Sequence, residues 1–192
     1  MGREFELKYT ATEDILADLA EKYPGGRKIS METTYFDTPD GALSHQKMTL
    51  RIRKENGTSI CTLKTPLPDG SRGEWECQAS DIQEGVRILL KLGAPAKLAQ
   101  LAAGGLTVAC GARFVRHAIE VSTIDGIAEL ALDSGVLLGG GREIPLCEVE
   151  VELKSGSDAA TTAFAALLAA AYNLKEQPLS KFRRAMDLAK GE

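Results

Sequence analysis

Three short segments of the sequence place charged residues at every second position. Residues 4–9 read Glu-Phe-Glu-Leu-Lys-Tyr, residues 50–53 read Leu-Arg-Ile-Arg, and residues 148–154 read Glu-Val-Glu-Val-Glu-Leu-Lys. Because side chains two apart on a β-strand point to the same face, each segment predicts a strand with one charged and one apolar face. Two of these faces stack carboxylates, and the third stacks guanidinium groups.

The chemistry of these charged faces favours a site for a metal and a polyphosphate. Stacked carboxylates repel one another unless cations lie between them, and a hard divalent cation binds several carboxylate oxygens. Paired guanidinium groups match the oxygens of phosphate. The alternative is a half-buried antiparallel sheet with solvated charges, which suits any single strand but leaves the like charges of 4–6 and 148–152 without local neutralisation.

Other charged residues fall on the faces of neighbouring predicted strands. Glu129 and Asp133 share a face, because they are four apart in the strand expected at 127–133. Arg113 and Arg116 are three apart, so they face opposite ways and cannot both line one site. The residues that share a face after the proline- and glycine-rich loop at 66–73 are Arg72, Glu74 and Glu76.

Turn signals and periodicity predict the elements that position these residues. Asn56-Gly57 is the strongest turn signal, and it joins two strands in a hairpin. Strands are expected at 4–9, 33–36, 48–55, 58–64, 74–79, 106–121, 127–133 and 144–154. Helices are expected between Thr12 and Pro24 and at 81–92, 95–102, 158–172 and 180–189. About eight strands joined by short turns predict an α+β fold with a closed or strongly curled antiparallel sheet.

Composition limits the classes of partner. The chain has 192 residues, with 27 acidic against 23 basic residues and a net charge of −4, whereas proteins that bind nucleic acid usually carry a basic excess. No apolar run is long enough to span a membrane. The four cysteines are scattered without a C-x-x-C pair, which argues against zinc and favours reduced thiols in a cytoplasmic protein.

The ordered set of motifs resembles the CYTH superfamily, also called triphosphate tunnel metalloenzymes. The resemblance starts with E-x-E-x-K at Glu4, Glu6 and Lys8, and the order and spacing hold from residue 3 to about 187. The other matching positions are 35–39, 50–53, 62–64, Arg116, 132–133, 147–152, Ser180, Lys181 and Arg184.

The resemblance implies one domain over residues 1–192, built as an eight-stranded antiparallel β-barrel with helices packed outside it and at the C-terminus. It implies Mg²⁺ or Mn²⁺ as cofactor, with metal ligands at Glu4, Glu6, Glu148, Glu150, Glu152, Glu129 and Asp133. It also implies phosphate-binding residues at Lys8, Arg51, Arg53, Lys64, Arg116 and Lys181. Glu4, Glu6, Lys8, Glu148 and Glu150 form its catalytic set. For Lys181 the alternative is a solvated charge in the first turn of the last helix.

The function that the resemblance favours is hydrolysis of inorganic triphosphate (tripolyphosphate) to pyrophosphate and phosphate. The alternatives are a class IV adenylate cyclase that forms cyclic AMP from ATP, a thiamine triphosphatase, and a non-catalytic polyphosphate-binding module. The expected partner is therefore a small triphosphate, with neither nucleic acid nor membrane. Some members of the family form homodimers or carry a C-terminal CHAD domain, so a homodimer and a longer native chain both stay open.

Overall fold

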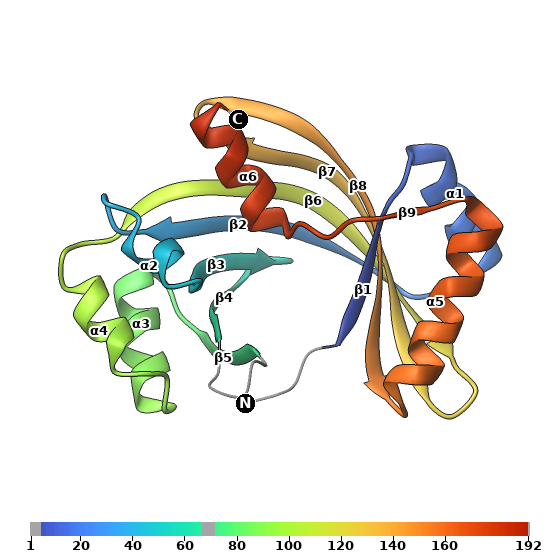
Figure 1. The fold of residues 1–192 in the computed structure, drawn as a ribbon, viewed down its shortest axis with the longest axis horizontal. Coiled ribbons are helices and arrows are strands. Elements are labelled where there is room, and N and C mark those ends of the chain that lie inside the picture. Colours follow the sequence, from blue (N-terminus) through green and yellow to red (C-terminus); the bar gives the residue numbers. More distant parts are fainter. Residues whose placement is uncertain (1–4, 67–71, 192) are drawn as a thin grey trace.

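The computed structural model describes residues 5–66 and 72–191, and its centre is one antiparallel sheet (Figure 1). Within these ranges nine strands follow the order β5-β4-β3-β2-β6-β7-β8-β1-β9. The strands are β1 (Glu6–Thr10), β2 (Arg27–Asp37), β3 (Thr49–Glu55), β4 (Thr58–Pro66), β5 (Arg72–Gln78), β6 (Thr107–Ser122), β7 (Ile127–Gly139), β8 (Arg142–Ser155) and β9 (Lys175–Glu176). The helices are α1 (Glu13–Lys22), α2 (Ala42–His45), α3 (Ile82–Lys91), α4 (Lys97–Ala102), α5 (Asp158–Tyr172) and α6 (Lys181–Lys190).

The sheet curls into an open arch, so the expectation of a closed eight-stranded barrel is wrong. Closure would require the edge strand β5 to pair with the opposite edge, and the described residues form no such ladder. The far edge of β1 is instead taken by the two-residue strand β9, through the pairs Tyr9 with Glu176 and Thr10 with Lys175. Because β1 already pairs with β8 on its other side, it has no edge left for β5 at these positions.

The predicted hairpin at Asn56-Gly57 is present between β3 and β4. Both residues have positive φ, at 49° and 92°, which is the backbone that a two-residue hairpin turn of this type requires. Two elements were not expected. The short helix α2 follows β2, where the Asp37 carboxylate accepts hydrogen bonds from the backbone N–H groups of Leu43 and Ser44. The strand β9 lies between the two predicted C-terminal helices, in a segment for which no element was predicted.

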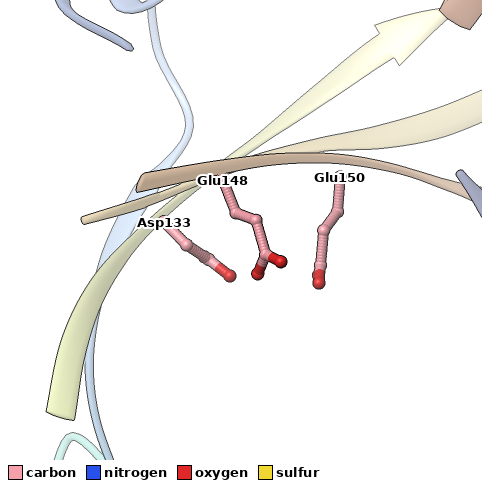
Figure 2. A group of neighbouring side chains, drawn as sticks. All are labelled: Asp133, Glu148 and Glu150. Atoms are coloured by element: carbon pink, nitrogen blue, oxygen red, sulfur yellow. The ribbon is translucent and has the colours of Figure 1, made fainter. Parts of the chain in front are cut away.

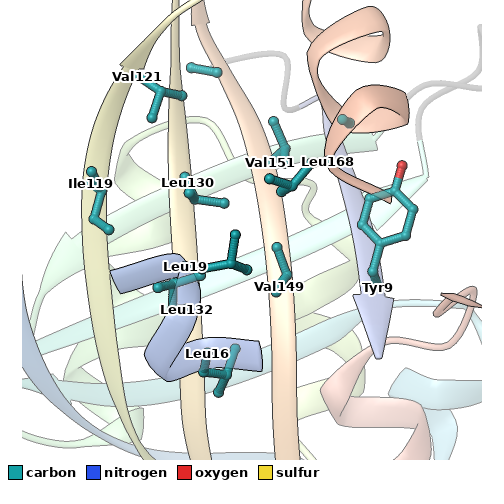
Figure 3. Close-up of a cluster of buried hydrophobic side chains, with 12 residues drawn as sticks. Tyr9, Leu16, Leu19, Ile119, Val121, Leu130, Leu132, Val149, Val151 and Leu168 are labelled. Atoms are coloured by element: carbon teal, nitrogen blue, oxygen red, sulfur yellow. The ribbon is translucent and has the colours of Figure 1, made fainter. Parts of the chain in front are cut away.

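Five helices cover the convex face of the sheet at its two ends (Figure 1). At one end α1 and α5 pack on apolar side chains of β6, β7 and β8 (Figure 3). These side chains alternate along the strands with charged residues. The buried residues in this cluster include Leu16, Leu19, Leu130, Val149, Val151 and Leu168. At the other end α2, α3 and α4 cover β3 and β4 around Leu50 and Leu63. The apolar faces of the strands therefore lie under helices, as their alternation predicts.

None of the helices in the described ranges combines the length and the hydropathy needed to cross a lipid bilayer.

The last helix, α6, differs from the other five because it packs on the concave face of the sheet, against β6, β7 and β8. Its residues Phe182, Ala185 and Met186 contact an apolar patch that includes Ala112 and Leu146. A helix at the C-terminus was predicted, but the face of the sheet that it covers was not. Its position brings the first turn of the helix to the charged half of the concave face.

We expect Gly139→Ala to move α6 and to lower the free energy of unfolding. A Cβ atom at Gly139 would meet the backbone of α6 at the carbonyl oxygen of Ala185, and it would lie 2.7 Å from the nitrogen of Ala189. Relieving such a clash costs about 1–3 kcal/mol, measurable by urea denaturation. The matched control is Gly104→Ala, whose nearest heavy atom would be the Leu101 oxygen at 3.8 Å. Equal stability of the two variants would contradict the close packing of α6 on β7.

Candidate active site

A cavity of about 210 Å³ opens on the concave face, between β1 and β8 on one side and β3 and β4 on the other. Among the described residues, seven basic and three acidic side chains line it, a formal surplus of four positive charges. The basic residues are Lys8, Arg51, Arg53, Lys64, Arg72, Arg116 and Lys181, and the acidic ones are Glu6, Glu150 and Glu152. The cavity is thus electropositive although the whole chain has a net charge of −4. All six residues expected to bind phosphate reach it.

The two arginines of β3 form the basic wall of the cavity and are only partly neutralised. Arg53 is buried, and its Nε donates a hydrogen bond to the Thr33 hydroxyl at 3.0 Å. Burial and the neighbouring Arg51 lower the pKa of Arg53 to about 10, which indicates an incompletely compensated charge. The Nε of Arg51 is buried without a hydrogen-bond partner among the described residues, and its guanidinium lies 4.0 Å from Glu76. Both side chains therefore keep capacity for an added anion.

Two lysines stand on opposite sides of the same cavity. Lys64 on β4 lies 3.4 Å from the carboxylate of Glu74. Lys8 on β1 lies 3.2 Å from the carboxylate of Glu6. The cavity therefore presents ammonium groups from both ends of the sheet to any ligand bound between them.

Three carboxylates converge beneath the cavity and form what we call the buried acid cluster: Asp133 on β7, with Glu148 and Glu150 on β8 (Figure 2). Asp133 and Glu148 are paired directly across the two strands, and Glu150 lies two residues further along the same face. One oxygen from each carboxylate lies within 4.8 Å of the others, so the cluster has the geometry to hold a metal ion. The sequence predicted that these three residues share a site, and the structure brings them together.

Three cationic side chains surround the buried acid cluster. Arg116 donates two hydrogen bonds to Asp133, both of 2.7 Å, and also contacts Glu150. The Lys181 ammonium lies 2.7 Å from Glu150 and 2.9 Å from Asp133, and it contacts Glu148. Arg184 donates to Glu148 at 2.6 Å. The Lys181 side chain is buried, so the alternative of a solvated charge does not hold.

The pKa values in this network follow from the opposing effects of burial and charge. Burial alone would raise the pKa of Glu150, but the charges of Lys181 and Arg116 outweigh it and hold that pKa well below its ordinary value. Burial alone would lower the pKa of Lys181, and the three carboxylates instead hold it above its ordinary value. The Glu150 carboxylate and the Lys181 ammonium are therefore both ionised near neutral pH.

The remaining predicted metal ligands form a second acidic row nearer the cavity mouth. Cross-strand pairing places Glu129 opposite Glu152, and Glu152 opposite Glu6. The side chains of Glu6 and Glu152 are about a quarter exposed, at 27% and 26%. Of the row, Glu6 and Glu152 line the cavity and Glu129 does not. Glu4, the first residue of the E-x-E-x-K motif, lies outside the described residues.

Several site residues were not assigned a role from the sequence. Arg184 follows Lys181 by three positions and lies on the same side of α6, so helical spacing could have identified it as a second cation of that helix. Thr33 accepts a hydrogen bond from Arg53, and Thr62 donates one to Glu76 beside the cavity. An isolated threonine in a strand gives no sequence signal for such a role. Tyr35 and Phe182 also line the cavity.

Comparison with known proteins identifies the family of this chain. Residues 2–186 match the CYTH domain family. The chain belongs to the CYTH family. The inorganic triphosphatase of Haemophilus influenzae (strain ATCC 51907 / DSM 11121 / KW20 / Rd) is a CYTH relative that is 30% identical over 164 residues, which are 82% of this chain and 47% of that protein. The chain thus spans about half the length of this curated relative.

Solved structures share the CYTH fold over nearly the whole chain. A candidate adenylate cyclase from Bacillus halodurans has a TM-score of 0.64 at 26% identity, covering 94% of this chain and 96% of that chain. A candidate adenylyl cyclase from Hippeastrum, in which triphosphatase activity dominates, has a TM-score of 0.67 at 20% identity, covering 98% and 96%. The second likeness shows the fold alone.

We expect Arg116→Met to destabilise the CYTH domain far more than Arg113→Met. Arg116 is ion-paired in the buried network, and removing it leaves Asp133 and Glu150 short of a cation, at a cost of about 3–5 kcal/mol. Arg113 lies three residues earlier on the opposite face and pairs with Glu143 at 2.8 Å, with both side chains more than half exposed. Loss of that pair costs under about 1 kcal/mol. Urea denaturation without ligand measures both, and similar losses would contradict the buried network.

Proposed function

We propose that this domain hydrolyses inorganic triphosphate to pyrophosphate and phosphate with the help of Mg²⁺ or Mn²⁺. The observation that carries the proposal is the pair of under-neutralised arginines on β3, facing a carboxylate row across one electropositive cavity. Guanidinium groups on one side suit phosphate oxygens, and carboxylates on the other suit a divalent cation bound to the same phosphates. Similarity to a relative that is named an inorganic triphosphatase supports the same substrate.

The donors at the acidic side fit a hard divalent cation. Glu6 and Glu152 offer carboxylate oxygens at the cavity wall, and Mg²⁺ usually completes its shell with waters and substrate phosphates. Glu4 and Glu129 remain predicted ligands of the wider acidic set. Asp133, Glu148 and Glu150, which were also predicted as ligands, are already ion-paired with Lys181. When bound, such an ion neutralises phosphoryl oxygens and makes the attacking water more acidic.

The basic residues hold the substrate and stabilise the leaving group. Arg51, Arg53 and Lys64 bind phosphates from the β3–β4 side, while Lys8 and Arg116 bind them from the opposite side. Lys181, also predicted to bind phosphate, lies at the floor of the cavity, where its ammonium faces the buried acid cluster. Charge that develops on the departing pyrophosphate is stabilised by these fixed cations, which need no rearrangement during the reaction.

A carboxylate of the second acidic row is the better base for the attacking water. Glu150 is held ionised by Lys181 and Arg116, so its lowered pKa makes it a weak proton acceptor. Glu6 and Glu152 lie nearer to solvent at the cavity wall. We therefore assign proton acceptance to one of these two residues.

The cavity is less suited to the cyclase and thiamine triphosphatase alternatives, because both need a pocket for a ring system. The aromatic residues among its described lining, Tyr35 and Phe182, pack on one another with ring centroids 5.1 Å apart. They therefore offer little open face for a nucleobase to stack on. A pure binding module would need mainly the basic wall, and the acidic row then has no role.

Product analysis separates the four candidates. The protein is incubated with Mg²⁺ or Mn²⁺ and, in parallel, tripolyphosphate, ATP or thiamine triphosphate. We expect phosphate and pyrophosphate in equal amounts from tripolyphosphate, and slower turnover of the other two. Cyclic AMP from ATP without cleavage of tripolyphosphate would favour the cyclase. Tight binding without turnover of any of the three would favour the binding module.

Substitution of the basic wall tests the phosphate-binding role. We expect Arg51→Met to lower kcat/KM for tripolyphosphate by about 10²-fold or more, the usual cost of removing a donor aimed at transition-state charge. The matched control is Lys54→Met, which removes one positive charge from the same strand but at an exposed position on the other face. Steady-state kinetics that show equal losses for the two variants would rule out a specific contact by Arg51.

A further inference from the structure

The ammonium group of Lys181 lies at the point where the buried acid cluster converges. Its Nζ contacts one oxygen from each of the three carboxylates, at 2.9 Å for Asp133, 2.7 Å for Glu150 and in close contact for Glu148. A lysine ammonium carries three N–H donors and no acceptor. Lys181 donates a hydrogen bond to Glu150 and is ion-paired with Asp133 and Glu148, so its charge faces all three carboxylates. One cationic centre among three carboxylates is the arrangement that a metal ion has in an oxygen-ligand site.

The buried acid cluster would qualify as a metal site if this ammonium were absent. Its three ligand oxygens lie within 4.8 Å of one another and come from adjacent strands of a rigid sheet (Figure 2). The side chains of Asp133 and Glu148 are fully buried, and that of Glu150 is 8% exposed. The cluster is thus preorganised for a cation, and the chain itself provides one.

The charge balance shows why a divalent ion and Lys181 do not share the cluster. Among the described residues, three carboxylates face three cations: Lys181, Arg116 and Arg184. An added divalent ion would leave a surplus of two positive charges in a buried region, and uncompensated buried charge is very unfavourable. The carboxylates of Glu6 and Glu152 lie nearer the cavity mouth and are more exposed, so the same penalty is smaller there.

We propose that Lys181 is a tethered cation that takes the place of a divalent metal in the buried acid cluster. Metal binding by the domain is then confined to carboxylates nearer the cavity mouth, Glu6 and Glu152 among them. This second statement rests on the proposed function, which requires a metal. The first turn of α6 thereby completes the acidic side of the site, because the helix brings the cation to a cluster formed by β7 and β8.

Manganese binding to Lys181→Met tests the proposal directly. Methionine keeps most of the side-chain volume and removes the charge, which leaves the cluster with an excess carboxylate. Metal-free protein is titrated with MnCl₂ in the absence of phosphate compounds, and free Mn²⁺ is followed by electron paramagnetic resonance. We expect one more tightly bound Mn²⁺ per chain than in the wild type. The control Lys54→Met removes an exposed lysine on the other face of β3, outside the cavity and the cluster, and it should leave the Mn²⁺ count unchanged.

Thermal unfolding keeps the test decisive if Lys181→Met is unstable. Without metal this variant should melt below the wild type, because the carboxylates have lost a cation, and Mn²⁺ should raise its Tm by more than it raises the wild-type Tm. The double variant Lys181→Met with Glu148→Gln removes one charge of each sign. It should fold without metal and should show the wild-type Mn²⁺ count.

Three results would overturn the proposal. The first is a folded Lys181→Met protein with the Mn²⁺ count and Tm response of the wild type. The second is a Lys181→Met protein that stays unfolded even with Mn²⁺, since the metal then cannot replace the ammonium. The third is loss of a bound Mn²⁺ from the wild type on Asp133→Asn. A wild-type protein that cleaves no tripolyphosphate would instead refute the proposed function, and the Mn²⁺ comparison between variants would still be readable.

Discussion

Carboxylates stacked on the concave face of β7 and β8 cannot remain ionised at such short separations unless cations lie between them. The chain meets this requirement with side chains from two other elements, Arg116 on β6 and the pair Lys181 and Arg184 on α6. This requirement accounts for the placement of α6, which packs on the concave face while the other helices cover the convex one. Small residues at the contact, such as Gly139, let the helix approach closely enough for Lys181 to reach the carboxylates.

The two sides of the cavity differ in how far their charges are satisfied. The charge of the buried acid cluster is balanced by cations of the chain, whereas Arg53 has a lowered pKa and the Nε of Arg51 has no hydrogen-bond partner among the described residues. The protein alone therefore presents an excess of positive charge at one wall, and a polyanion is the ligand that would relieve it. The net charge of −4 for the whole chain does not predict this positive wall, because the local arrangement of charges determines which ligands the cavity attracts.

Period-two alternation and turn residues are local features of the sequence. They predicted the two faces of individual strands and the position of a hairpin, which depend on local sequence alone. The alternation of Glu148 and Glu150 with Val149 and Val151 correctly separates the charged face from the helix-covered face. Asn56-Gly57 correctly places the hairpin. Closure of the sheet was predicted wrongly, because it depends on whether β1 has a free edge, and the two residues of β9 are too short a segment to predict as a strand. The sequence made no prediction of the side of the sheet that α6 covers, since an amphipathic helix does not specify which face it will meet.

A crystal structure with a non-hydrolysable imido analogue of triphosphate and Mn²⁺ would test the central claim most directly, namely that the concave face holds a metal–triphosphate pair between a basic and an acidic wall. The account predicts phosphate oxygens in contact with Arg51 and Arg53, and an anomalous manganese peak beside Glu6 and Glu152. Phosphates bound on the convex face, or an analogue that contacts neither arginine of β3, would contradict it.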